Sequence, residues 1–434
     1  MSERVWITGI GTVSPVGLDR PSFWKGCVEG RSGARAQQNP WLLKSDVVTR
    51  IAADVRDFDP TERGLQKRFA TNMDRTAQFA VVAAEEALRD AGFELPERPG
   101  TRGLLEIDGA EPERVATIVG SGIGGLTTLE LSHAQWREGL TKNSVKRYSL
   151  PMLIPNSPAG QIAIRFRAMG ECKAIATACA AGTMSIGDAW RCIVSGEADV
   201  AITGGADGTA GDHDAYAIMG FERLRTLSTR NDEPERASRP FDTDRDGFVL
   251  GEGAGILILE REAHARARGV KPYAAVAGYG VNCDAHSMMQ LDDSGDTIVA
   301  LIDRALRSAD LPADAVDFVS AHGTSTRLND KTEAQAIRRR FKNRTDEIRV
   351  TALKSMTGHG IGASGPLETA AAAIGFREGV ITPTINHENT DPECPVRIVA
   401  NRPEDYRPQA ALKLSYGFGG HNACLVLVGA DRGA

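Results

Sequence analysis

The 434-residue sequence predicts an α/β fold built from two similar halves. Short runs rich in β-branched residues alternate with longer Ala-rich stretches, the pattern of strands that alternate with helices. In each half, four such runs end in Gly-containing loops in the same order. The first series begins at residues 5, 115, 174 and 200, and the second at residues 273, 316, 349 and 411. This repetition indicates an internal duplication, with residues 1–265 and 266–434 as the two halves.

Two helices are expected at equivalent places in the two halves. The first should begin at Cys179 and run to Gly196, and the second should span Ala363 to Glu378. The second consists almost entirely of small residues, so we expect it to be packed on several sides in the core. The more irregular and charged region from Arg31 to Arg114 is expected to form a surface layer.

Composition narrows the class of function. The formal net charge of −6, with both signs mixed, argues against nucleic-acid binding. No apolar run approaches the ~18 residues needed to cross a membrane, and the first residues lack the pattern of a signal peptide. The seven Cys form no CxxC pair, so most should be reduced and buried. These features predict a cytoplasmic protein with no membrane or nucleic-acid partner.

Cys179 is the strongest candidate for a catalytic group. It lies in Thr177-Ala-Cys179-Ala-Ala-Gly, where small neighbours leave open space above the sulfur. Its predicted place at a helix N-terminus, with unpaired backbone N–H groups and the helix dipole, favours a thiolate. A lone Cys is more often a buried packing residue. Cys172, seven residues earlier, lacks the small neighbours that Cys179 has.

Two histidines on separate loops are candidate partners of the thiol. His322 lies in Ala321-His322-Gly-Thr-Ser-Thr326, and His359 in Lys354-Ser-Met-Thr-Gly-His359-Gly. Both loops follow strands and contain Gly, at the edge where α/β folds bind ligands. Either His alone could be a core residue with satisfied hydrogen bonds. Together with Cys179 they favour covalent thiol catalysis.

Other motifs resemble cofactor or metal sites without completing them. Gly120-Ser-Gly-Ile-Gly-Gly125 lacks the final spacing of a dinucleotide loop. The run Asp242-Thr-Asp-Arg-Asp246-Gly247 places Gly253 where a calcium loop needs a carboxylate. His387 and His421 have no partners at ligand spacing. We therefore expect no metal site.

The motifs together resemble the β-ketoacyl-[acyl-carrier-protein] synthases, and more narrowly the elongating ketosynthases of type II fatty-acid and polyketide systems. The resemblance runs from Val5 to Val428. It rests on Thr177-Ala-Cys179, His322-Gly-Thr-Ser-Thr, Lys354-Ser-Met-Thr-Gly-His359 and Gly417-Phe418-Gly-Gly. It implies a thiolase-like fold, in which two βαβαβαββ halves form αβαβα layers, and a dimeric assembly.

The chemistry implied by the resemblance is a decarboxylative Claisen condensation. Cys179 would accept an acyl group from the phosphopantetheine of a carrier protein, and a malonyl-carrier protein would then lose carbon dioxide and attack the acyl-cysteine. His322 and His359 would face the oxygen on which negative charge grows. The backbone N–H groups of Cys179 and Phe418 would form the oxyanion hole. The enzyme would bind no cofactor of its own, because the phosphopantetheine arrives on the carrier.

Further positions match the substrate-binding residues of the family. Phe418 is also the gate onto the acyl pocket, and Ile123 and Phe221 match the pocket wall. The hydroxyls of Thr324 and Thr326 would contact pantetheine.

Charged residues have two expected roles. Lys354 and Glu368 match a supporting ion pair of the family, and a carboxylate on a buried helix needs such a partner. From spacing alone, Lys354 could equally be a surface lysine. The carrier protein is acidic, so its docking surface should be basic. The candidates are Lys67, Arg68 and Arg75 on one face, with Arg223 and Arg225 near the entrance.

Four positions depart from the usual family pattern: Met184, Arg327, Gly360 and His421. They remove no catalytic group, and they favour a specialised polyketide or polyene pathway in which the ketosynthase pairs with a silent chain-length factor. Housekeeping fatty-acid elongation is the alternative. A non-catalytic chain-length subunit is disfavoured because Cys179 is present. Whether the dimer is a homodimer or a heterodimer stays open.

Overall fold

The computed structural model describes residues 4–211 and 215–430. Its centre is an 11-stranded sheet with the order β12-β10-β9-β14-β15-β8-β1-β7-β6-β4-β5. The strands of the first half are β1 (Val5–Val13), β4 (Val115–Gly120), β5 (Cys172–Ile175), β6 (Val200–Asp207) and β7 (Gly253–Arg261). Those of the second half are β8 (Ala274–Cys283), β9 (Phe318–Ser320), β10 (Arg349–Thr351), β12 (Arg397–Ile398), β14 (Ala410–Gly417) and β15 (His421–Val428).

Two sets of five strands within this sheet have the same arrangement. The first set runs β5-β4-β6-β7-β1 and the second runs β10-β9-β14-β15-β8. In both, the first two pairings are parallel and the last two antiparallel. β1 and β8 pair antiparallel and join the sets. The eight strands expected from the sequence occupy equivalent places, so the predicted duplication is confirmed.

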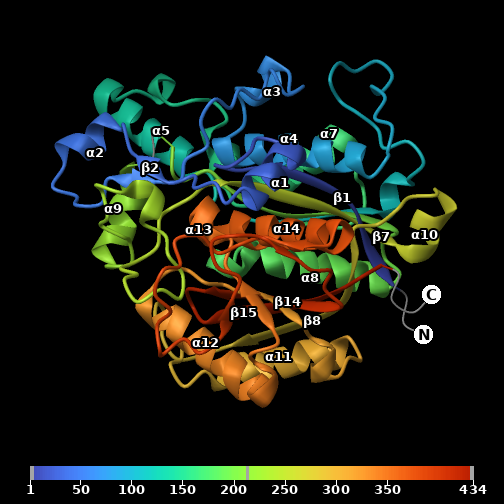
Figure 1. The fold of residues 1–434 in the computed structure, drawn as a ribbon. Coiled ribbons are helices and arrows are strands. Elements are labelled where there is room, and N and C mark those ends of the chain that lie inside the picture. The colour runs from blue at the N-terminus through green and yellow to red at the C-terminus, as the bar shows by residue number, and fades with distance from the viewer. Residues whose placement is uncertain (1–3, 212–214, 431–434) are drawn as a thin grey trace.

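Helices complete five layers, which Figure 1 shows from one side. α4 (Arg75–Asp90) and α7 (Ser157–Phe166) cover the outer face of the first set. α8 (Ala181–Val194) and α14 (Ser364–Glu378) lie between the two sets, and α11 (Asp296–Ser308) and α12 (Arg327–Phe341) cover the second. This αβαβα arrangement is the predicted thiolase-like fold.

Shorter elements connect the layers. The helices are α1 (Arg20–Val28), α2 (Pro40–Lys44), α3 (Lys67–Ala70), α5 (Leu126–Gly139), α6 (Ser149–Leu153), α9 (Ala215–Arg223), α10 (Glu262–Ala267) and α13 (Lys354–Thr357), and the strands are β2 (Arg35–Ala36), β3 (Ile51–Ala52), β11 (Val380–Ile381) and β13 (Glu404–Asp405). The predicted boundary between residues 265 and 266 falls inside α10 and stays a prediction. Within the described ranges, no helix has both the length and the apolar character that a membrane span requires.

The expectation of a surface layer from Arg31 to Arg114 is wrong for α4. This helix packs on β1, β6 and β7 and buries Phe79, Val81 and Leu88. Asp74 caps its N-terminus, because its carboxylate accepts a hydrogen bond from the N–H of Thr76 at 2.9 Å. Several charged residues of the helix also point inward: Glu86 and Asp90 accept hydrogen bonds from the N–H groups of Thr12 and Ile10 in β1. In the sequence these charges concealed the apolar face.

The central helices α8 and α14 cross at their first turns with almost no side chains between them. A Cβ on Gly182 would lie 2.2 Å from the carbonyl oxygen of Gly362, and one on Gly365 would lie 2.0 Å from Thr183 Oγ1. α14 is buried from Ser364 to Phe376, as predicted for a helix of small residues. The crossing brings the N-terminal ends of two helices from different halves to the same place.

Candidate active site

Cys179 lies in a one-turn 3₁₀ helix, Ala178–Ala180, and α8 begins only at Ala181. Ala178 has a φ of +48°, a left-handed conformation that costs free energy for a residue with a Cβ. Gly417 supports the turn from β14, where a Cβ would lie 2.6 Å from the carbonyl oxygen of Thr177. Strand and turn together fix the direction of the thiol.

The thiol opens into a cavity of about 410 Å³ that residues of both halves line. Most of the predicted site residues meet here: Cys179, Phe221, Arg225, His322, Thr324, Thr326, His359 and Phe418. Ile123 belongs to the apolar cluster that contains Cys179 and Ile361. The structure therefore brings the predicted nucleophile, histidines and substrate-binding residues together.

Burial raises the pKa of the Cys179 thiol to about 12. The charge of Lys354 and the backbone N–H groups of Cys179 and Phe418 act in the opposite direction, but they do not overcome the loss of hydration. The backbone N–H groups therefore favour the thiolate, as expected, but burial has the larger effect and favours the protonated thiol. The sulfur must lose this proton during acyl transfer.

His322 follows β9 and is anchored by Lys354. Lys354 Nζ donates to the His322 carbonyl oxygen at 2.6 Å and lies 3.3 Å from His322 Nδ1. Because an ammonium group only donates, Nδ1 must accept, and the ring proton resides on Nε2. Burial, followed by the charge of Lys354, lowers the pKa of His322 well below its usual value. The ring is thus a neutral Nε2–H donor.

His359 follows α13 and reaches the same state by another route. Its Nδ1 lies 3.1 Å from Ser364 Oγ, which accepts a hydrogen bond from the N–H of Gly360 at 2.9 Å. The hydroxyl of Ser364 can then donate its proton to Nδ1, and in that arrangement the ring proton lies on Nε2. Burial lowers the pKa of His359 well below its usual value. The His322 and His359 ring centroids are 5.5 Å apart.

The ion pair predicted between Lys354 and Glu368 is present, with a distance of 2.6 Å between Nζ and Oε1. A second lysine, Lys413 of β14, lies 2.7 Å from Oε2 of the same carboxylate. All three side chains are buried. The sequence analysis missed Lys413, although a lysine in the middle of the apolar run from residue 411 to 417 was a signal that it needs a buried partner.

Asp207, at the end of β6, is a second residue that the sequence analysis missed. Its carboxylate accepts hydrogen bonds from the N–H groups of Gly122, Ile123 and Gly362 at 2.8, 3.2 and 2.7 Å. Ser121 Oγ donates a fourth at 2.7 Å. Burial raises the pKa of Asp207 to about 6. This one carboxylate ties the loop that carries Ile123 to the start of α14.

The basic residues predicted to dock a carrier protein have different surroundings. Lys67 and Arg68 on α3 are exposed, and so are Arg223 and Arg225, of which Arg225 lines the cavity. Arg75 instead points inward, where its guanidinium lies 2.7 Å from the buried Glu252 carboxylate. The face predicted from three residues therefore retains only Lys67 and Arg68.

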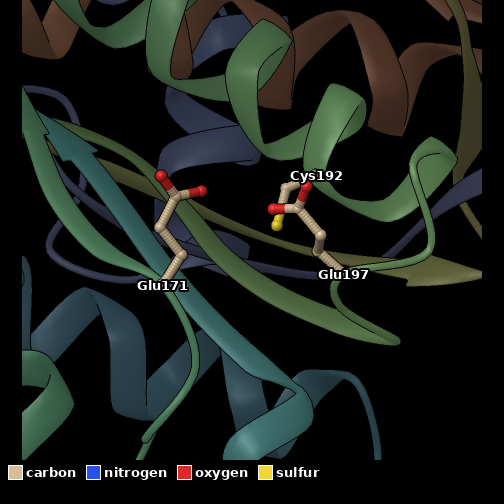
Figure 2. A group of neighbouring side chains, drawn as sticks. All are labelled: Glu171, Cys192 and Glu197. Atoms are coloured by element: carbon tan, nitrogen blue, oxygen red, sulfur yellow. The ribbon is translucent and has the colours of Figure 1, made fainter.

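A separate group of possible metal ligands lies beside α8, away from the cavity. The ligand atoms of Glu171, Cys192 and Glu197 lie within 4.8 Å of one another. Figure 2 shows these three side chains. Lys173 Nζ lies 3.1 Å from Glu171 Oε1, and burial together with the two carboxylates raises the pKa of Cys192 to about 11. A protonated thiol beside an ion-paired carboxylate is a poor ligand set. That the enzyme needs no metal stays a prediction.

A buried thiol and two neutral imidazoles in one cavity of a thiolase-like fold define a thiol-dependent acyl-transfer enzyme. The family model of the beta-ketoacyl synthase N-terminal domain matches residues 2–265, and that of the C-terminal domain matches residues 273–388. The 3-oxoacyl-[acyl-carrier-protein] synthase 2 of Synechocystis sp. is 39% identical over 424 residues, which cover 98% of this chain and 97% of the relative. The chain belongs to the β-ketoacyl synthase family.

Solved structures agree with this assignment. One is a type II PKS acyl-carrier protein in complex with its ketosynthase bound to the hexaketide. The matched chain is 30% identical in sequence with a TM-score of 0.87, and the alignment covers 99% of this chain and 100% of that chain. The ishigamide ketosynthase/chain length factor is 33% identical with a TM-score of 0.86, and covers 99% of both chains. The match extends over the whole fold in both cases.

Proposed function

We propose that this enzyme is an elongating ketosynthase that condenses malonyl-carrier protein with an acyl group held on Cys179 to give β-ketoacyl-carrier protein. The observation that carries this proposal is the pair of neutral histidines. Lys354 and Ser364 lie beside the Nδ1 atoms of His322 and His359, which suits both rings to act as Nε2–H donors in the cavity that Cys179 opens into. Two such donors suit a step that builds negative charge on an oxygen.

Acyl loading is the first half of the reaction. The sulfur of Cys179 attacks the thioester carbon of the incoming acyl group, the bond from that carbon to the phosphopantetheine sulfur breaks, and the thiol proton passes to the departing sulfur. The backbone N–H groups of Cys179 and Phe418 act on the thiol of Cys179, and they would donate to the thioester oxygen when the attack on its carbon turns it into an oxyanion. Loss of one such donor typically costs ~10²–10³ in rate.

Condensation is the second half. The bond between the malonyl carboxylate and its α-carbon breaks, carbon dioxide leaves, and the electron pair moves onto the thioester oxygen. His322 and His359 stabilise this enolate by donating from Nε2. The α-carbon then attacks the acyl carbon on Cys179, the bond from that carbon to the sulfur breaks, and the sulfur leaves as a thiolate that takes a proton from water. Neutral rings serve this step because they need no counter-ion in a cavity that burial has desolvated.

The substrate-binding residues are proposed from their places around the cavity. Phe418 and Phe221 have ring centroids 6.4 Å apart, so a movement of Phe418 would open the space beside the sulfur. Ile123 would limit the length of the acyl chain. The hydroxyls of Thr324 and Thr326 are 2.9 Å apart and would contact the pantetheine arm. The arm belongs to the carrier protein, and no enzyme-bound cofactor is proposed.

Two kinds of partner are proposed. An acidic carrier protein would dock on Lys67, Arg68, Arg223 and Arg225. A second subunit would cover the free edge of the sheet at β5, whose residues are exposed or half-buried. Exposed apolar side chains on and after α5 form a second candidate surface for a partner: Leu129, Trp136, Leu140, Tyr148 and Leu150. A homodimer and a heterodimer with a chain-length factor would both satisfy it.

A specialised polyketide or polyene pathway is favoured by the four departures from the family pattern. The likeness to a type II PKS ketosynthase and to the ishigamide ketosynthase/chain length factor also favours it. Housekeeping fatty-acid elongation is the second candidate, favoured by the 39% identity to a 3-oxoacyl-[acyl-carrier-protein] synthase 2. A cytoplasmic location is proposed from the cysteines, which are all free among the described residues.

Mass spectrometry of the two half-reactions tests the proposed function. The wild-type enzyme should gain an acyl group from acyl-carrier protein, and Cys179→Ala should not. His322→Ala and His359→Ala should impair the decarboxylation of malonyl-carrier protein more than acyl loading. Equal acylation of Cys179→Ala would refute the nucleophile. Equal loss of both steps in the histidine variants would mean that the imidazoles activate the thiol.

A further inference from the structure

The segment that carries Thr324 and Thr326 is held from behind by buried charged groups. Glu333 accepts hydrogen bonds from the N–H groups of His322 and Gly323 at 2.7 and 2.9 Å. Beyond them, Ser325 has a φ of +69°, an unfavourable conformation for a residue with a side chain. A segment in this conformation keeps its shape only where the surrounding structure imposes it.

Arg245 provides such a restraint at the far end of the segment. Its side chain is 2% exposed. Its Nε donates to the carbonyl oxygen of Thr326 at 3.2 Å, and its Nη2 donates to that of Arg327 at 3.0 Å. The third nitrogen, Nη1, donates to the Asp242 carbonyl oxygen and to Asp391 Oδ2, both at 2.7 Å. One planar guanidinium therefore ties two cavity-lining residues to two other segments.

We propose that Arg245 is a positioning residue that sets how tightly the enzyme holds the pantetheine arm of its carrier-bound substrate. This inference rests on the proposed function, in which Thr324 and Thr326 contact that arm. The reacting groups are anchored separately, because Glu333 and Lys354 hold His322 without Arg245. Loosening the segment should therefore weaken substrate binding and leave the chemistry intact.

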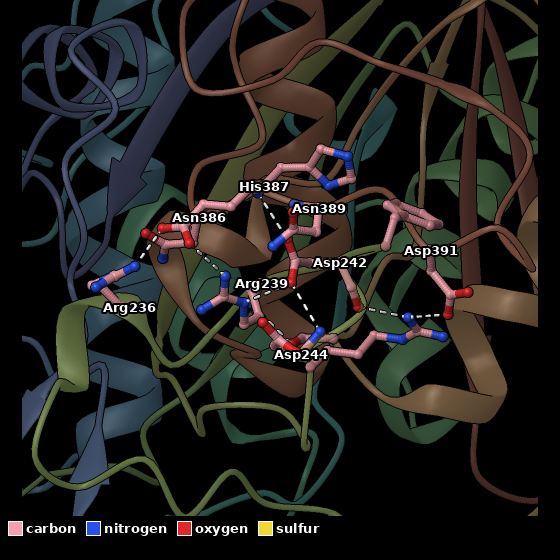
Figure 3. A network of polar contacts seen from close by, with 12 residues as sticks. Arg236, Arg239, Asp242, Asp244, Asn386, His387, Asn389 and Asp391 are labelled. Carbon is pink, nitrogen blue, oxygen red and sulfur yellow. Dashed lines mark hydrogen bonds and ion pairs between the residues drawn. The ribbon is translucent and has the colours of Figure 1, made fainter.

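The network around Arg245 also supplies a matched control. Figure 3 shows Arg239, Asp242 and Asp391 in one group of polar contacts. Arg239 is as buried as Arg245, and its Nε lies 3.0 Å from Asp242 Oδ1. Its contact with this segment is made by its backbone N–H, which donates to Ser325 Oγ at 2.9 Å and is kept when the side chain becomes lysine. Arg239→Lys thus disturbs the same buried network without releasing the two carbonyl groups.

Steady-state kinetics with two donors test the proposal, with malonyl-carrier protein and with malonyl-N-acetylcysteamine, which lacks most of the arm. A lysine cannot reproduce the three-pronged contact of a guanidinium. We expect Arg245→Lys to raise KM for malonyl-carrier protein about tenfold, because a tenfold change in affinity corresponds to the free energy of one charge-assisted hydrogen bond. The value of kcat should change less than about twofold. Its rate with malonyl-N-acetylcysteamine should stay within about twofold of wild type, and Arg239→Lys should change neither.

Further variants keep the test decisive. If Arg245→Lys does not fold, Asp391→Asn weakens the same clamp at a side chain that is 15% exposed, and it should raise the same KM. Thr326→Val combined with Arg245→Lys should be no worse than Thr326→Val alone, since both act through one contact. Equal effects of Arg245→Lys and Arg239→Lys, or an equal loss with the truncated donor, would overturn the role of Arg245. A wild-type enzyme that condenses neither donor would refute the proposed function itself.

Discussion

Replacing Lys354 with Met separates the two roles of this residue, the ion pair and the control of His322. Lys354 Nζ contacts Glu368, the His322 carbonyl oxygen and His322 Nδ1 at 2.6, 2.6 and 3.3 Å. Methionine fills most of the same volume without a donor. Removing one partner of a buried ion pair typically costs ~3–5 kcal/mol. Because Glu368 keeps Lys413 at 2.7 Å, we expect the lower end of that range, with the fold retained.

The larger consequence should be on His322. Without the ammonium group, His322 Nδ1 has no hydrogen bond to accept from residue 354. The ring proton can then move from Nε2 to Nδ1, and the Nε2–H group that would donate to the enolate is lost. The charge that helps to lower the pKa of His322 is also gone, so this pKa should rise toward its usual value. Protonation of His322 would then compete with the working neutral form at mildly acidic pH. Loss of one oriented donor predicts a fall of ~10²-fold in decarboxylation.

The assay measures decarboxylation of malonyl-carrier protein by mass spectrometry in a Cys179→Ala background, between about pH 5.5 and 8. The parent should be insensitive to pH, because both histidines stay neutral. Lys354→Met should be slower and should lose rate as the pH falls. Lys413→Met is the control, since it removes a lysine from Glu368 and leaves the His322 contact. A Lys354→Met profile that matches the parent in rate and shape would refute this account.

Three other predictions follow from particular contacts. His359 is neutral in the folded protein and binds a proton more readily in the unfolded protein. The difference in free energy of unfolding between wild type and His359→Asn should therefore fall by about 1 kcal/mol as the pH falls from about 6 to 5. Urea denaturation at each pH measures this difference. Gly182→Ala would place a Cβ 2.2 Å from the Gly362 carbonyl oxygen, so it should lower the free energy of unfolding by ~1–3 kcal/mol or more. Gly196→Ala is the control: its Cβ would meet no neighbour, so only the strain of its positive φ should lower the free energy of unfolding. Ile123→Trp should slow loading of long acyl chains more than about tenfold and of short chains less than about twofold, as seen in mass spectra of acyl-Cys179; equal effects on both would place Ile123 outside the acyl pocket.

The sequence was sufficient for the architecture and for the reacting groups because both leave local signatures. The strands that end in Gly loops repeat in order, so the duplication could be recognised without knowing how the strands pair. Cys179, His322 and His359 each lie in a short motif that follows a strand, with the short helix α13 between β10 and His359. Catalytic groups that are defined by residue type and local spacing can therefore be predicted from the sequence alone.

The supporting residues were missed because they act across the fold. Lys413 and Glu368 are 2.7 Å apart only because β14 and α14 pack together, and Asp207 meets Gly362 only at the crossing of the two halves. The protonation of Cys179 is a further case, since its pKa depends on how completely the folded chain excludes water. The exact start of α8, two residues after Cys179, depends on the support that Gly417 gives the preceding turn.

One buried charge links the two half-reactions. The ammonium of Lys354 opposes the burial that raises the pKa of Cys179, and it adds to the burial that lowers the pKa of His322 and His359. A positive charge at this position therefore eases deprotonation of the thiol during loading and keeps both rings neutral for decarboxylation. A negative charge would hinder both steps, and this explains why the carboxylate of Glu368 stands behind Lys354 and shares its charge with Lys413. The two half-reactions therefore both require a positive charge at residue 354, and the ion pair with Glu368 holds the Lys354 ammonium group in its position.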